Sequence, residues 1–328
     1  MDVLINEVED NIITEDYLLI FPVRLNNRID LTKHGIEIFN VDSDRFRELN
    51  PEGAIEKTIP AYQNIIYSDH TEYCYVIGCK EAAKMYLLLD FLRIIKPSNL
   101  VSPLSRFQIR FLKEGDSKRY WQMGSSAIWE EIDVNESVKQ PLNISIIDPD
   151  KFHYLFECYL SRVGDDNFEK LTGIYFTAIH TKIPPVRFLV FMILLECLVA
   201  DSDNTGIVYK ICRVCAILLG DDPKTSEMVF ENLKILYGDR SSLVHSGGTD
   251  HLNTDKVNYL HNLVCEVLNT FMLGKIELKK LIVFSNKYGF GQRANLLADF
   301  DIKTDSRFVS TRRKLLDVMV KRPVREKE

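Results

Sequence analysis

The second half of the chain is divided into helix-length segments by prolines and glycines, and this pattern constrains the fold more than any other feature. Asp148 and Asp222 each precede a proline, which is typical of an N-cap followed by the first helical residue. Gly220 and Gly247 stand where helices should end. The pattern predicts helices over residues 149–163, 167–180, 185–200, 205–220, 223–246 and 254–273. Long helices joined by short loops indicate an antiparallel bundle.

The first part of the chain follows a different pattern. Apolar or alternating runs predict strands over residues 17–25, 35–39, 73–78, 107–112 and 120–123. Helical spacing predicts one helix over 80–95, with Pro97 just past its end. We therefore expect an α+β module of unknown specificity over residues 1–147, an all-α helical bundle over 148–300 and a basic tail over 301–328.

The charge of the chain is distributed unevenly. The formal net charge of −6 argues against nucleic-acid binding over the whole surface. Residues 303–328, however, hold nine Lys or Arg and four Asp or Glu. A basic tail of this kind is either a solvated segment or a long-range attractor of phosphate.

The sequence also bears on the compartment of the protein. The N-terminus is acidic where a signal peptide would be basic. The longest apolar run, Phe188 to Ala200, is shorter than the roughly 20 residues that a membrane-spanning helix needs. Seven cysteines, an odd number, fit reduced thiols better than a disulfide framework. We therefore expect a cytoplasmic protein that has no membrane partner.

The residues of greatest chemical interest lie late in the longest predicted helix, within 236–248. Arg240 and His245 are separated by four residues there, and two glycines then end the helix. On an ideal helix the two side chains are about 140° apart, so they do not share one narrow face. The spacing alone leaves ordinary packing open, with Tyr237 as a core contact and Arg240 paired with a carboxylate.

Three segments in order resemble one protein family. These are 188–200 with Glu196, then 211–220 (ICRVCAILLG), then 236–248. Together they are similar to the Apea-like branch of the HEPN superfamily over about residues 185–273. The resemblance implies a helical bundle that dimerises and carries an Arg-x4-His motif at a composite cleft. In many members that motif is a metal-independent ribonuclease site.

The resemblance implies catalysis by Arg240 and His245, supported by Glu196, Asp239 and Ser241. Cleaving RNA without a metal requires a base for the 2′-hydroxyl, an acid for the departing 5′-oxygen and a cation on the phosphate. Histidine titrates in the range needed for either proton transfer, and arginine can hold two phosphate oxygens at once. One chain supplies one motif histidine, so a homodimer would supply the second. No cofactor or metal is expected, and RNA is the expected partner, in stress or antiviral defence.

Two alternatives stay open. Glu196 lies in an apolar helix, where a carboxylate needs a partner, and we expect contact with Arg240 or Arg213 unless it faces water. The bundle as a whole is alternatively a non-catalytic module that binds a nucleotide, an RNA or a protein. The short spacing, Ser241 where catalytic members often have Asn, Asp or His, and the acidic net charge favour this second interpretation.

The remaining motifs are interpreted as structural. Cys212 and Cys215 lie within an apolar helix without a second ligand pair, which indicates core thiols rather than a zinc site. Residues 289–293 contain two glycines but lack the Lys-Ser/Thr of a nucleotide loop, so a turn is predicted. Four further histidines form no metal pattern: His153, His180, His251 and His261.

Overall fold

The structure is a computed structural model. It describes residues 12–24, 29–40, 43–49, 74–95, 105–114, 117–124, 142–143, 148–199, 206–250 and 252–302. The chain divides into two compact units, Met1–Tyr154 (unit 1) and Leu155–Glu328 (unit 2). The division falls within helix α7 (Pro149–Leu160), a short way beyond the expected boundary at residue 147. The basic tail lies outside the described residues.

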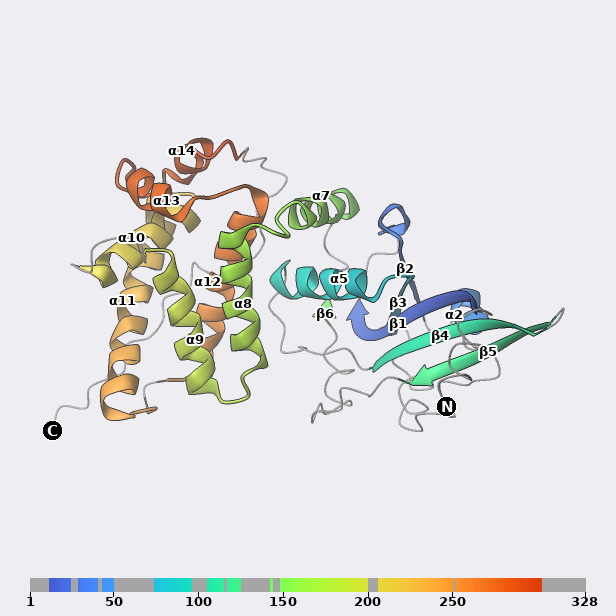
Figure 1. The fold of residues 1–328 in the computed structure, drawn as a ribbon. Helices are drawn as coiled ribbons and strands as arrows, with labels where there is room; N and C mark the ends of the chain where they lie inside the picture. The colour runs from blue at the N-terminus through green and yellow to red at the C-terminus, as the bar shows by residue number, and fades with distance from the viewer. Residues whose placement is uncertain are drawn as a thin grey trace. The chain divides into compact units, whose positions relative to one another are not determined.

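Unit 1 contains a mainly antiparallel sheet (Figure 1). Its strands are β1 (Ile12–Arg24), β2 (Ile36–Asn40), β3 (Cys74–Cys79), β4 (Ser105–Glu114), β5 (Ser117–Gly124) and β6 (Leu142–Asn143). The order is β2-β3-β1-β4-β5, and β6 pairs in parallel with β1. Each strand predicted from the sequence is present, whereas β6 is too short to produce a periodic signal. The long β1 is central, pairing Leu18 with Gly78 on one side and with Phe107 on the other.

A helix and two shorter elements complete the described part of unit 1. Helix α5 (Ala82–Ile95) was expected from its spacing, and its apolar side chains Met85, Leu88, Leu89 and Leu92 are all buried. Phe91 of α5 meets Phe152 of α7 edge to face, with ring centroids 5.3 Å apart. The short elements are η1 (Thr32–His34) and α2 (Asp44–Leu49).

Unit 2 is a helical bundle (Figure 1). It comprises α8 (Asp166–His180), α9 (Pro184–Cys197), α10 (Ile207–Leu219), α11 (Pro223–Ser246), α12 (Thr254–Leu273), α13 (Leu278–Ser285) and α14 (Arg293–Ala298). Helix α9 packs against α8, α11 and α12, and α10 packs against α11, α12, α13 and α14. The bounds of α11 and α12 are those predicted, and the short α14 was not predicted.

The caps explain why these helices begin and end where they do. Asp148 accepts a hydrogen bond from the Lys151 amide at 3.1 Å, at the start of α7. Asp222 does the same for the Thr225 amide at 2.9 Å, at the start of α11. At the other end of α11, Gly247 adopts the left-handed conformation with φ of 66°. The predicted capping roles of these residues are confirmed.

Two arginines link segments of the bundle by donating hydrogen bonds to backbone carbonyl oxygens. Arg213 of α10 donates to the Tyr288 carbonyl oxygen at 2.7 Å, just past α13. The buried Arg293 of α14 donates from Nε to the Leu218 carbonyl oxygen at 2.6 Å. Cys212 and Cys215 lie on α10 as free, fully buried thiols, and burial raises the pKa of Cys212 to about 12. They are core residues, as predicted.

The predicted turn at 289–293 is present and brings Gly291 against the start of α11. Gly291 has φ of 82°, and an added Cβ would lie 2.6 Å from the ring of Pro223. We expect Gly291→Ala to lower the free energy of unfolding by more than about 1 kcal/mol. A side chain would be strained at this positive φ and would overlap the ring of Pro223. Urea denaturation measures this change.

Gly173 offers the matched control. It is exposed within α8, and an added Cβ would meet nothing within 4 Å. Gly173→Ala should therefore stabilise unit 2 by about 0.5–1 kcal/mol. Equal effects of the two substitutions would contradict the close approach at Gly291.

Candidate functional site

The last turns of α11 carry the candidate site, and Arg240 is its best-defined residue. Its Nη2 lies 3.0 Å from Oε1 of Glu196 on α9, and both side chains are about one-third exposed, at 34% and 27%. The expected contact of Glu196 with Arg240 is thus present. Arg213 instead donates to carbonyl oxygens at the end of α13. Among the described residues the guanidinium has one carboxylate contact, at the surface, which leaves other N–H groups for an anion.

Asp239, the residue before Arg240, lies in a different environment. Its carboxylate is 2.7 Å from Nζ of Lys256 on α12, and both side chains are more than nine-tenths buried. Successive residues on a helix are about 100° apart, so Asp239 and Arg240 reach different neighbours. The Asp239–Lys256 pair therefore fixes the position of the α11 backbone beside Arg240, and Asp239 does not face solvent.

His245 and Ser241 are exposed at the surface of α11. Within the described parts of the chain, no hydrogen bond or ion pair joins either side chain to another group. His245 lies in the last turn of the helix, next to the Gly247 cap. The structure therefore brings Arg240 to Glu196 but does not bring His245 into contact with Arg240. The imidazole is accessible to a bound molecule instead of being packed in an apolar core.

Tyr237 belongs to the same site, although the sequence marked it only as a core contact. It lies one turn before Arg240 and is 7% exposed. Its hydroxyl is buried and has no hydrogen-bond partner among the described residues. Burial raises the pKa of this phenol, the negative charge of Glu196 raises it further, and Arg240 acts in the opposite direction. The Tyr–x2–Arg spacing, which places both residues on one helix face, was the available signal.

The arrangement can bind an anion and exchange a proton at the same surface. A partly exposed guanidinium suits a phosphate or carboxylate oxygen pair, and an imidazole is a side chain that can serve as a general acid or base. Each chain offers one such guanidinium and one such imidazole from the motif. A reaction that needs both a general base and a general acid would therefore use a further group.

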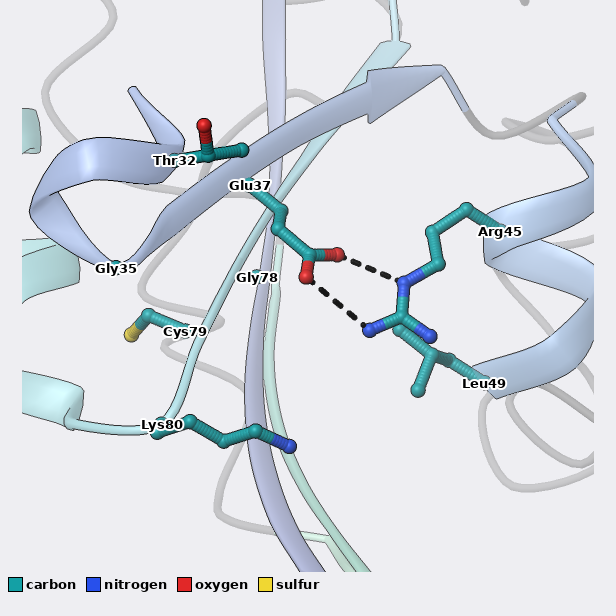
Figure 2. Close-up of a pocket in the computed structure, with 8 residues that line it drawn as sticks. All are labelled: Thr32, Gly35, Glu37, Arg45, Leu49, Gly78, Cys79 and Lys80. Atoms are coloured by element: carbon teal, nitrogen blue, oxygen red, sulfur yellow. Dashed lines mark hydrogen bonds and ion pairs between the residues drawn. The ribbon is translucent and has the colours of Figure 1, made fainter. Parts of the chain in front are cut away.

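Unit 1 contains a separate pocket of about 130 Å³ (Figure 2). Its lining residues are Thr32, Gly35, Glu37, Arg45, Leu49, Gly78, Cys79 and Lys80. Arg45 and Glu37 approach each other across one wall, and none of the residues proposed from the sequence lines the pocket.

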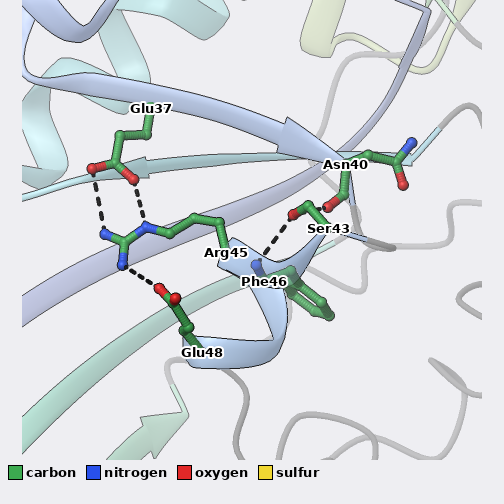
Figure 3. A network of polar contacts seen from close by, with 6 residues as sticks. All are labelled: Glu37, Asn40, Ser43, Arg45, Phe46 and Glu48. Atoms are coloured by element: carbon green, nitrogen blue, oxygen red, sulfur yellow. Dashed lines mark hydrogen bonds and ion pairs between the residues drawn. The ribbon is translucent and has the colours of Figure 1, made fainter.

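The charged wall of this pocket is neutralised within the protein (Figure 3). Arg45 donates from Nε and Nη2 to Glu37 at 2.7 and 3.3 Å, and from Nη1 to Glu48 at 3.3 Å. The Cys79 thiol donates to the Glu81 carbonyl oxygen at 2.8 Å, and burial raises its pKa. A protonated thiol is a poor nucleophile, so Cys79 is not an activated nucleophile in this pocket.

Three of the four further histidines make hydrogen bonds to other described residues. His153 accepts from the Asp30 amide, His180 bonds the Phe176 carbonyl oxygen, and the buried His261 bonds the Tyr175 hydroxyl. His251 lies outside the described residues. Across the described ranges, no cluster of three or more His, Cys, Asp or Glu side chains is arranged to hold a metal ion.

No family model, curated protein or solved structure matches this chain. None of the helices in the described part is both long and apolar enough to cross a membrane.

The Asp239–Lys256 pair gives a stability test of the site. Lys256→Met would leave Asp239 buried without its cation, and we expect the free energy of unfolding to fall by about 3–5 kcal/mol. Urea denaturation checks this. Lys280→Met is the control, because Lys280 pairs with Glu277 at 2.6 Å with both side chains half exposed. That change should cost about 1 kcal/mol or less. Similar losses in both variants would contradict a stabilising role of the buried pair.

Proposed function

We propose that unit 2 is a HEPN-type, metal-independent endoribonuclease that acts as a homodimer in the cytoplasm, in stress or antiviral defence. The observation that carries the proposal is the pairing of Arg240 with Glu196, with an exposed His245 five residues further along α11. This pairing joins two of the three sequence segments that resemble the Apea-like family. An exposed imidazole and a partly exposed guanidinium are also the side-chain types that phosphodiester cleavage needs.

The chemistry assigns one role to each motif residue. Arg240 would bind the non-bridging phosphate oxygens and stabilise the negative charge that develops on the phosphorus. His245 of one copy would remove the proton from the 2′-hydroxyl as the O2′–P bond forms. The same histidine of the second copy would protonate the 5′-oxygen as the P–O5′ bond breaks. The products are a 2′,3′-cyclic phosphate and a 5′-hydroxyl.

The outer face of α9 supports association with a second copy. Its apolar residues repeat at alternating intervals of three and four, as in helices that pair with another helix. Ile183, Val186 and Ile193 are 60%, 42% and 47% exposed, and Val190 and Cys197 are half-buried. We call these five residues the α9 stripe. The opposite face of α9 is buried in the bundle, so this helix is apolar nearly all round.

An apolar helix of this kind is expected to be buried on all sides. The α9 stripe also adjoins the candidate site, because Glu196 lies between Ile193 and Cys197 on the same helix. Pairing two copies through the stripe would therefore bring two Arg240–Glu196 contacts toward one interface. This continuity makes a second copy the proposed occupant of the stripe.

The catalytic assignment predicts that His245→Ala abolishes cleavage while the fold is kept. Purified protein would be incubated with mixed RNA in the presence of EDTA, and the ends would be analysed for 2′,3′-cyclic phosphate. A 2′-deoxy substrate should stay intact because it lacks the nucleophile.

His180→Ala is the matched control. His180 is also an exposed histidine in the last turn of its helix, α8, and lies outside the motif. Cleavage should persist in this variant. A fully active His245→Ala protein would contradict the catalytic assignment.

The dimer assignment predicts that Ile193→Glu yields a monomer that no longer cleaves RNA, because a charge would be placed in the apolar interface. Sedimentation or light scattering measures the oligomeric state. Val283→Glu on α13 is the control, because Val283 is 59% exposed and lies outside the α9 stripe. A monomeric wild-type protein with full activity would contradict the composite site.

The alternative is a non-catalytic module that binds a nucleotide, an RNA or a protein. One observation favours it: Glu196 already neutralises Arg240 in the single chain. The same RNA assay separates the two functions, because a binding module would retain RNA without cleaving it in both the wild-type and the His245→Ala protein.

A further inference from the structure

Three aromatic rings from separate segments of unit 2 meet at its surface, and we call them the aromatic cluster. Tyr209 lies in the first turn of α10, Phe230 in the first half of α11, and Phe290 in the turn at 289–293. The ring centroids of Tyr209 and Phe230 are 5.6 Å apart, and those of Phe230 and Phe290 are 5.7 Å apart. Tyr209 is 57% exposed, and the other two residues are half-buried. Aromatic side chains gain most when they are buried, so an exposed cluster indicates contact with another molecule.

Lys234 places a positive charge beside the aromatic cluster. Its Nζ lies 5.5 Å from the centroid of the Phe230 ring and 2.9 Å from Oε1 of Glu231, and the lysine side chain is 47% exposed. A surface ion pair of this kind is weak, so the ammonium can exchange the carboxylate for a phosphate. Glu227 is exposed one turn before Phe230, and its charge would repel phosphate there. The cluster therefore offers rings to bases, with a phosphate contact only on the side of Lys234.

The aromatic cluster is aligned with the candidate site along α11. Phe230 and His245 are about 60° apart around an ideal helix and about 22 Å apart along its axis. Lys234, Gly238 and Ser241 lie on the same face and are exposed. An added Cβ at Gly238 would meet nothing within 4 Å. The face that joins the cluster to His245 is therefore open to solvent at these three positions.

We propose that the aromatic cluster stacks bases of a single-stranded RNA whose scissile phosphate lies at Arg240 and His245. This inference rests on the proposed function and names its substrate class. Every base has a flat π face, so stacking on aromatic side chains tolerates any sequence. A duplex keeps its bases stacked on one another, so the cluster would favour a single strand. With bases about 3.4 Å apart, about six nucleotides span the distance from Phe230 to His245.

The test compares two fluorescent single-stranded probes of about 12 nucleotides, roughly twice the span. Both have 2′-deoxyribose throughout, so neither can be cleaved, and anisotropy reports the Kd. One probe carries bases, and the other is abasic at every position but keeps its phosphates. Tyr209→Ala should weaken binding of the base-bearing probe about tenfold and leave binding of the abasic probe unchanged. Lys234→Ala should weaken binding of both probes by the same factor, because it removes a phosphate contact.

Two variants serve as controls. Tyr209→Phe keeps the ring and should bind both probes as the wild type does. Tyr154→Ala removes a tyrosine that is 39% exposed on α7, outside the cluster, and should also bind as the wild type does.

A shorter probe tests whether one strand reaches both places. A base-bearing probe of about three nucleotides cannot span from the aromatic cluster to His245. In the wild type, affinity should therefore rise when the probe is lengthened from about three to about 12 nucleotides. In Tyr209→Ala this gain should be about tenfold smaller. An equal gain in both proteins would show that the cluster and the candidate site do not hold the same strand.

Three further results would overturn the inference. Unchanged binding of the base-bearing probe by Tyr209→Ala would show that RNA does not reach the cluster. An equal loss with the abasic probe would show that bases do not stack there. A change in the oligomeric state of Tyr209→Ala, measured by sedimentation, would assign the cluster to a protein contact. A wild-type protein that shows the expected dependence on Tyr209 but cleaves no RNA would support the stacking surface and overturn the proposed function alone.

Discussion

The buried contact between Asp239 and Lys256 ties the last turns of α11 to the start of α12, and the geometry of the candidate site depends on it. Two charges removed from water in this way are costly unless they stay paired. The backbone of α11 is therefore held in one position at Asp239. Arg240 follows directly and projects toward α9, where Glu196 meets it. Asp239 thus ties α11 to α12, and Arg240 ties it to α9. His245 lies beyond both contacts, at the exposed end of the helix.

This arrangement explains why the two motif residues differ so much in their surroundings. Arg240 lies at the surface of the bundle, about one-third exposed, where the Glu196 carboxylate fixes its guanidinium. His245 is more than one turn further along, near the glycine that ends the helix, and is open to solvent. A site assembled from one fixed cation and one accessible imidazole is incomplete for acid–base chemistry in a single chain. In the proposed homodimer, the apolar face of α9 beside Glu196 would be the surface that a second copy covers.

The fold was predictable where its signals are local. The Asp–Pro pair before α11 and the glycine after it act within a few residues, so the helix bounds followed from the sequence. Strand β6 and helix α14 are short, and their existence depends on neighbours that the sequence does not identify. The site was harder to predict. Glu196 could be matched to Arg240 or Arg213 only as alternatives, because the choice depends on how α9 and α10 are rotated. Lys256 gave no signal, since lysines are usually exposed and its burial results from tertiary packing.

The apolar outer face of α9 has a consequence for the concentration at which the protein would work. If two copies associate through that face, each chain gains part of its folding free energy from its partner by mass action. The population of complete sites then rises with the square of the protein concentration while most chains are single. A modest change in expression would therefore be amplified into a larger change in active protein. The abundance of the chain would therefore control how many complete sites form at the end of α11.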